Sequence, residues 1–194
     1  MKLSLDLTYQ TPPEWADEVL KDFDAFLQDH ADCERKASAM AMSFVAKCPD
    51  KTAILPELID TAIEELEHFR MVYQLMQQRG VTLPTEMAPD NYMRSLIALC
   101  RSSPQERLLD RMLLASIVEC RGAERFRLIA NALTDPELKS FYKTLWASEA
   151  KHGNIFVKLA LKYWDEAPVY ARLKTLTEAE GEICSRLPWR PALH

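Results

Sequence analysis

The chain has 194 residues, 48% of them hydrophobic and 9% aromatic, which is enough to bury the core of one domain spanning residues 1–194. It has no apolar run typical of a signal peptide and no stretch near the ~20 apolar residues of a membrane span, so a soluble, cytoplasmic protein without a membrane partner is expected. The net charge of −5 divides into −8 over residues 1–97 and +3 over residues 98–194, which permits a basic face in the second half.

The composition indicates an all-α fold. Only four glycines are present, and no alternating apolar and polar segment lies between turn residues as a strand would. The five cysteines are an odd number without a C-x-x-C pair, which favours reduced thiols over a disulfide framework or a zinc site.

Apolar residues that recur at steps of three and four predict four core helices, at about residues 21–48, 51–79, 104–133 and 136–163. Shorter helices are expected near residues 15–20, 91–100 and 168–186. The connection over residues 81–103 is long enough to cross between two helical hairpins. These elements predict a ferritin-like four-helix bundle with a long crossover and extra short N-terminal, crossover and C-terminal helices.

Each predicted core helix carries one carboxylate in the middle of its apolar stripe. On the second helix the spacing places Glu65 inward, rather than Glu64 or Glu67. Two of these carboxylates begin E-x-x-H motifs, in which a histidine lies one helical turn later on the same face. The two halves repeat, since 31 residues separate the first pair of carboxylates and 30 the second. The inward polar set is Glu34, Glu65, His68, Glu119, Glu149 and His152.

Four carboxylates buried together need protons, cationic partners or metal ions to offset their charge. Two divalent ions match four carboxylates, and this ligand set is that of di-iron and di-manganese bundles. By that analogy Glu34 and His68 hold one metal and Glu119 and His152 the other. Glu65 and Glu149 bridge them. Oxygen and nitrogen ligands suit iron or manganese, and iron is favoured where O₂ is handled.

Two neighbouring positions have two interpretations each. His30 lies four residues before Glu34 on the same stripe, where a core or supporting role is favoured over a ligand role because the six-ligand set is complete without it. Gly122, one turn after Glu119, is a glycine inside a helix. It either leaves room beside the metals for O₂ or substrate, or allows close helix packing.

Four blocks of sequence resemble the motifs of the bacterial tRNA 2-methylthio-N6-isopentenyladenosine hydroxylase family. They are Asp29–Ala37 (DHADCERKA), Glu64–Phe69 (EELEHF), Val118–Phe126 (VECRGAERF) and Ser148–His152 (SEAKH). The resemblance covers all four core helices, from about residue 14 to residue 165.

This resemblance implies a non-haem di-iron monooxygenase that hydroxylates the isopentenyl group of the modified adenosine beside the anticodon. The tRNA anticodon loop is then the substrate, O₂ the oxidant, and an electron-transfer reductase or ferredoxin the source of two electrons. The sequence assigns no oligomeric state. The more basic half offers candidate phosphate contacts in Arg107, Arg111, Arg121, Arg125, Lys139 and Lys143.

Other functions share this pattern. A ferritin-like or rubrerythrin-like protein for iron storage or peroxide detoxification would use the same bundle, although the chain has no rubredoxin-like paired C-x-x-C. A di-manganese catalase would share the ligand set. A ribonucleotide-reductase radical subunit usually has a tyrosine where this chain has Val72. A helical interaction domain without metal is the fourth alternative.

Overall fold

The computed structural model describes residues 5–194, and over that range the chain forms eight helices and no strand, which confirms the all-α prediction. The helices are α1 (Glu14–Leu20), α2 (Phe23–Lys47), α3 (Leu55–Arg79), α4 (Asn91–Ala98), α5 (Pro104–Ala132), α6 (Pro136–His152), α7 (Ile155–Ala160) and α8 (Glu166–Arg186). Among these described helices, none is long and apolar enough to cross a membrane. The helices belong to two compact units, one of residues 18–88 and 189–193 and the other of the remaining residues.

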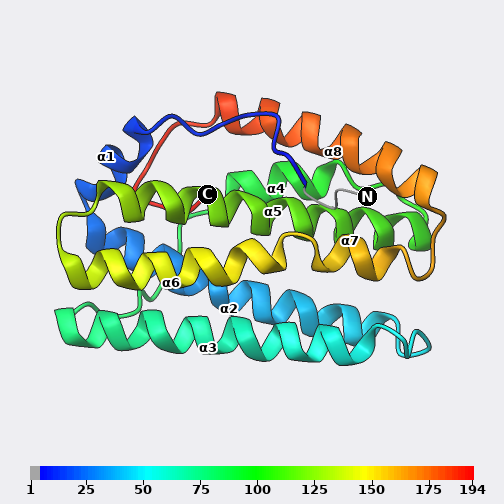
Figure 1. The fold of residues 1–194 in the computed structure, drawn as a ribbon, viewed down its shortest axis with the longest axis horizontal. Helices are drawn as coiled ribbons and strands as arrows, with labels where there is room; N and C mark the ends of the chain where they lie inside the picture. Colours follow the sequence, from blue (N-terminus) through cyan, green and yellow to red (C-terminus); the bar gives the residue numbers. More distant parts are fainter. Residues whose placement is uncertain (1–4) are drawn as a thin grey trace. The chain divides into compact units, whose positions relative to one another are not determined.

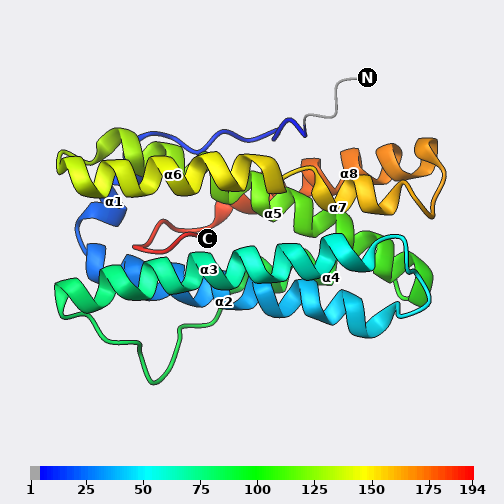
Figure 2. The same cartoon turned by 60° about the horizontal axis from the view of Figure 1, so that its bottom comes forward.

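The first unit is a hairpin of α2 and α3, which lie side by side in both views (Figures 1 and 2). Helix α2 begins after Asp22, whose side chain accepts a hydrogen bond from the backbone N–H of Ala25 at 3.0 Å. Helix α3 ends at Gly80, which has a φ of 70° and donates its N–H to the last carbonyls of the helix. These caps set the lengths of the two helices and therefore the register of the polar residues between them. We call this pair the α2–α3 unit.

The second unit is built around α5, and we call it the α5 unit. Helix α6 and its continuation α7 run along one side of α5, and α8 packs on α5 and α4 (Figures 1 and 2). Helix α6 begins after Asp135, whose side chain accepts hydrogen bonds from the N–H groups of Glu137 and Leu138. Because α5 has neighbours on several sides, it is buried along most of its length, from Leu109 to Ala130.

A buried carboxylate ties the start of α5 to α8. Asp110 accepts hydrogen bonds from Arg172 of α8 at 2.9 Å and from Arg101, in the loop before α5, at 2.8 Å. Burial by itself would raise the pKa of Asp110. The hydrogen bonds from Arg101 and Arg172 outweigh burial and lower that pKa from 3.8 to about 2. The carboxylate therefore stays charged and holds both arginines in place.

The fourth core helix differs from its prediction, because it does not run unbroken to about residue 163. Helix α6 ends at His152, two residues follow in a turn, and α7 begins at Ile155. The interruption comes directly after the second E-x-x-H motif. Side chains of α5 bond to the backbone at this interruption, and the periodicity of the sequence does not reveal these contacts.

Candidate metal site

In the α2–α3 unit the predicted ligands of one half lie together. Nδ1 of His68 lies 3.3 Å from Oε2 of Glu65 and 4.0 Å from Oε2 of Glu34. The other oxygen of Glu34 lies 2.7 Å from Nε2 of His30, one helical turn earlier. His30 therefore contacts a predicted ligand, which is what a supporting role would require.

In the α5 unit the second E-x-x-H motif also places its histidine close to its glutamate. Nδ1 of His152 lies 3.3 Å from Oε2 of Glu149, the same separation as in the motif on α3. Glu119 lies on α5, the helix that packs along α6. In both motifs, therefore, the imidazole turns Nδ1 toward the carboxylate three residues earlier.

All six predicted residues are inside the protein, with exposed fractions between 1% for Glu65 and 7% for Glu119. Glu64 and Glu67, the alternatives to Glu65, are not buried. Each unit contains one buried glutamate–histidine pair whose side chains could serve as metal ligands, Glu65 with His68 in the α2–α3 unit and Glu149 with His152 in the α5 unit. Burying carboxylates is costly unless cations offset their charge, so this donor set fits divalent metal ions.

The end of α6, beside His152, is positioned by two side chains of α5. The thiol of Cys120 lies 3.5 Å from the carbonyl oxygen of Gly153, to which it donates. Burial, together with the charge of Glu119, raises the pKa of Cys120 to about 12, so the thiol keeps its proton. Ser116 accepts a hydrogen bond from the backbone N–H of Val157 at 3.2 Å. This bond satisfies an N–H group in the first turn of α7, where the helix itself offers no acceptor.

The side chain of Cys120 lies so close to the backbone of residue 153 that only glycine fits there without a shift. A Cβ atom on Gly153 would lie 2.5 Å from the sulfur of Cys120, whereas a Cβ atom on Gly122 would meet nothing within 4 Å. Gly122 is nevertheless buried. Its surroundings therefore favour open space one turn after Glu119 over close helix packing.

A buried ion-pair network on α5 is centred on Arg121, two residues after Glu119. Arg121 is 0% exposed and donates to both carboxylate oxygens of Glu180 on α8, at 2.8 and 2.9 Å. It also donates to Glu124, which in turn accepts from the backbone N–H of Thr11 at 2.7 Å. The network joins α5, α8 and the segment before α1, and so fixes the rotation of α5 about its axis.

This network corrects two of the candidate phosphate contacts. The guanidinium of Arg121 is paired with the carboxylates of Glu180 and Glu124. Arg125 is buried, with its guanidinium 5.0 Å from the ring centre of Trp15. Neither side chain can reach a phosphate at the surface. Sequence periodicity missed the network because its partners come from α8 and the N-terminal segment, far away along the chain.

Comparisons with known proteins identify relatives of this chain. A curated hydroxylase of Pseudomonas putida, named tRNA 2-(methylsulfanyl)-N(6)-isopentenyladenosine(37) hydroxylase, is 35% identical over 89% of this chain and 83% of its own length. A protein of the same name from Salmonella typhimurium is 30% identical over 66% of this chain and 47% of its own length. A solved structure from Synechococcus, described as protein 43 with aldehyde deformylating oxygenase activity, has 31% identity and a TM-score of 0.90, covering 97% of this chain and 94% of that one.

The helical architecture, its likeness to that oxygenase and the buried carboxylates and imidazoles define a ferritin-like helical protein with side chains able to bind metal. A family model narrows this class to one family. The model of the tRNA-(MS2IO6A)-hydroxylase (MiaE) family matches residues 3–194, and the chain belongs to that family.

Proposed function

We propose that this protein is an O₂-dependent tRNA hydroxylase that acts on the isopentenyl group of 2-methylthio-N6-isopentenyladenosine next to the anticodon. Membership of the hydroxylase family over residues 3–194 supports this substrate. The observation that carries the chemistry is the pair of buried E-x-x-H motifs with equal imidazole–carboxylate distances of 3.3 Å. Because its substrate is tRNA, the proposed reaction takes place in the cytoplasm.

The proposed metal centre joins the two half-sites around two iron ions. Glu34 and His68 would hold one ion, and Glu119 and His152 the other. The bridging ligands would be Glu65 and Glu149. Four carboxylates balance two divalent ions, and donors limited to oxygen and nitrogen suit iron. The same ligand types are assigned to both halves, and the equal imidazole–carboxylate distances of the two motifs support this.

Bound iron would supply the reduction of O₂ to an oxidant that can attack a C–H bond. One oxygen atom enters the C–H bond of the isopentenyl group to give an alcohol. The other leaves as water, which forms with two electrons from a reductase or ferredoxin and two protons from the solvent. The chain itself holds the ligands in buried positions, which excludes bulk water from the reacting atoms. The open space beside Gly122 would admit the isopentenyl tip or O₂.

The anticodon loop presents its bases from a single strand, so the modified adenosine needs only to leave its stack to reach a buried site. This requirement separates the hydroxylase from an iron-storage protein, a peroxide-detoxifying protein or a di-manganese catalase, none of which needs an RNA surface. The family assignment favours the hydroxylase over these alternatives.

Metal analysis and nucleoside analysis together test the proposal. Purified protein should contain about two irons per chain and, with a reductant and O₂, should convert the isopentenyl nucleoside in tRNA to its hydroxylated form. Glu149→Ala should lower the iron content and abolish the conversion, while Glu137→Ala, an exposed change on the same helix, should do neither. Zinc-only protein, or unchanged tRNA with iron-loaded protein, would refute the proposed function.

A further inference from the structure

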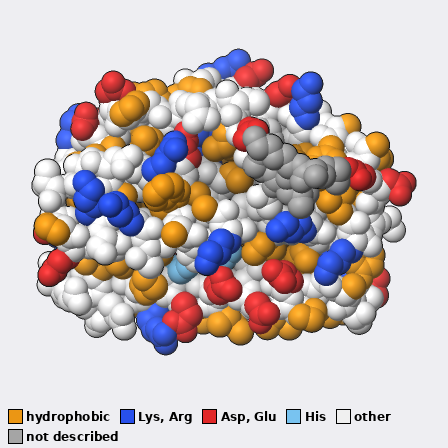
Figure 3. All heavy atoms as spheres, viewed as in Figure 1, with side chains coloured by type: hydrophobic (Ala, Val, Ile, Leu, Met, Phe, Trp, Pro, Cys, Tyr) orange, Lys and Arg blue, Asp and Glu red, His pale blue; other side chains and the backbone are white. Residues whose placement is uncertain are grey.

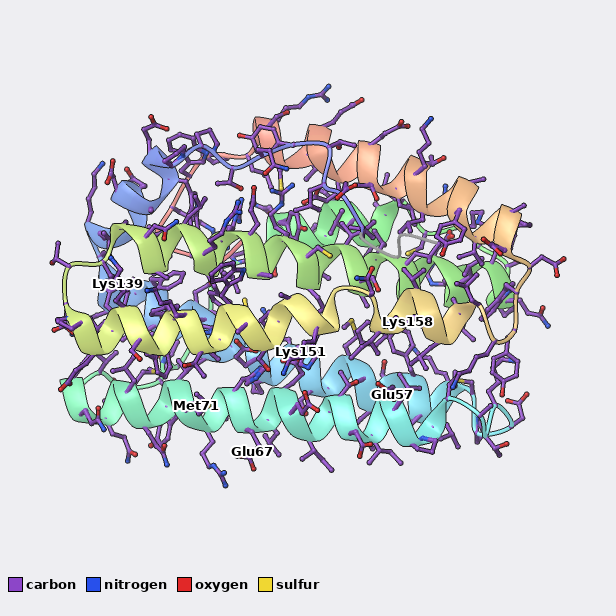
Figure 4. The ribbon with its side chains drawn as sticks, viewed as in Figure 1. Glu57, Glu67, Met71, Lys139, Lys151 and Lys158 are labelled. Carbon is purple, nitrogen blue, oxygen red and sulfur yellow. The ribbon has the colours of Figure 1, made fainter. Side chains whose placement is uncertain are left out.

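The outer face of α6 and α7 is basic. Lys143, Lys151 and Lys158 are exposed there, and Glu137 at the helix start is the one exposed carboxylate of these two helices, since Glu149 is buried. Figure 4 shows Lys139, Lys151 and Lys158 along this line, and Figure 3, in the same view, shows basic side chains over it. We call Lys143, Lys151 and Lys158 the lysine row.

The lysine row differs from most other surface cations in having no anionic partner. Within the described part of the chain none of its three lysines forms an ion pair. Elsewhere cations commonly pair with a carboxylate one turn away, as Arg35 does with Asp32, Arg70 with Glu67 and Lys174 with Glu178. Unpaired ammonium groups remain available to bind a polyanion.

Within residues 5–194, the other cations without an ion pair form no comparable row. Arg94 is on the short helix α4, Arg107 and Arg127 are both on α5, and the half-buried Lys139 donates to the carbonyl oxygen of Leu133. Arg107 and Arg127 are twenty residues apart, so at 3.6 residues per turn their side chains point about 200° apart around the helix axis. They therefore lie on opposite sides of α5. Helix α3 instead exposes the acidic side chains Glu57, Asp60 and Glu64, which would repel phosphate. Charge therefore selects the face of α6 and α7.

The spacing and the neighbouring side chains suit an RNA strand. Lys143 and Lys151 are eight residues apart, which is about 12 Å along a helix and within reach of separate phosphates of one strand. Between them Ala147 and Ala150 are small and exposed, so a sugar–phosphate chain can come close. Trp146, one turn from Lys143, is 36% exposed and offers a ring on which an unpaired base can stack.

We propose that the lysine row with Trp146 is the docking surface for the RNA strand of the tRNA substrate, placed on the same helix as the ligands Glu149 and His152. This inference rests on the proposed function. An acidic protein that delivers electrons is the competing occupant of a basic face. The exposed aromatic ring favours RNA, because an acidic protein surface has no unstacked bases to place on it.

The test compares two variants of equal charge. Lys143→Ala, Lys151→Ala and Lys158→Ala are combined in one protein. The control combines Lys21→Ala, Lys174→Ala and Arg186→Ala, whose side chains are exposed and paired with nearby glutamates. Affinity for an anticodon stem-loop carrying the isopentenyl nucleoside is measured by fluorescence anisotropy at several salt concentrations. Iron content and melting temperature are measured alongside, so that misfolding is recognised.

The lysine-row variant should bind the stem-loop at least about tenfold more weakly than the control, with a salt slope shallower by about one for each phosphate that it no longer binds. Trp146→Leu should weaken binding about tenfold while leaving the salt slope unchanged, because stacking releases no counterions. Equal affinity of the two triple variants would overturn the docking surface, whether or not reduction by an acidic electron carrier slows. Tight RNA binding by iron-loaded wild-type protein without hydroxylation would instead reject the proposed function.

Discussion

The thiol of Cys120 lies 3.5 Å from the carbonyl oxygen of Gly153, and a methyl group on that glycine would approach the sulfur to 2.5 Å. Cys120 follows Glu119 directly, and Gly153 follows His152 directly. The contact therefore joins α5 to the end of α6 immediately beside two predicted metal ligands. The contact leads to a first prediction, about Gly153 in the turn after α6 and Gly122 inside α5.

Gly153→Ala should destabilise the protein by about 1–3 kcal/mol through overpacking against Cys120. The φ of Gly153 is −51°, which alanine adopts without strain, so the clash decides the outcome. Gly122→Ala should instead stabilise the protein by up to about 1 kcal/mol, because alanine favours the helix and meets no neighbour. Urea unfolding measures both changes. Adding Cys120→Ala to Gly153→Ala should recover most of the loss, and absence of recovery would mean that the sulfur contact is not the cause.

The ion pair between Arg121 and Glu180 should be costly to break from one side. Arg121→Met leaves the carboxylate of Glu180 buried without its guanidinium, which should cost about 3–5 kcal/mol of unfolding free energy. The double variant Arg121→Met with Glu180→Met should lose less than the sum of the single changes, because no uncompensated charge remains at that pair. Chemical denaturation of the four proteins gives the coupling energy. Additive losses would show that the two side chains act independently.

Asp110 should make stability depend on pH under acidic conditions. Its pKa in the folded protein is about 2, below the ordinary 3.8, so the folded state holds the ionised form more strongly than the unfolded chain does. The stabilisation is complete above about pH 4 and is lost as the pH falls toward 2, amounting to about 2 kcal/mol. Thermal unfolding between pH 5 and pH 2 should show Asp110→Asn losing less stability on acidification than wild type. Asp165→Asn, an exposed change before α8, should follow the wild-type curve.

His30 should control metal affinity without being a ligand. Its Nε2 atom lies 2.7 Å from Glu34, and a group that orients a ligating carboxylate typically contributes 10–100-fold to metal affinity. His30→Leu should weaken iron binding by about that factor, whereas His30→Gln, which keeps a hydrogen-bonding group, should retain most of it. Iron titration of apoprotein measures this difference. Equal iron affinity of the two variants would contradict a role through hydrogen bonding.

Helix periodicity alone was enough to predict the all-helical class, the burial of the six polar residues and the choice of Glu65 over its neighbours. These features depend on which face of a helix a residue occupies, and 3.6 residues per turn fixes that face locally. The same reasoning could not distinguish Arg121 from Lys143, since both are basic residues of predicted helices. Only the tertiary structure brings Glu180 and Tyr9 to Arg121, and it leaves Lys143 exposed.

The end of α6 likewise depends on tertiary contacts that helical periodicity does not predict. The dipeptide Gly153-Asn154 is a helix-breaking signal in the sequence, but an apolar stripe that continues to Phe156 and Leu159 argues for an unbroken helix. The contact of Cys120 with Gly153 and the bond from Val157 to Ser116 stabilise the interruption. Both partners lie on α5, more than thirty residues earlier in the chain. The sequence by itself determined which polar side chains lie on the inner faces of the four helices, because that depends on helical spacing, whereas packing between distant segments decided where α6 stops and which cations stay at the surface.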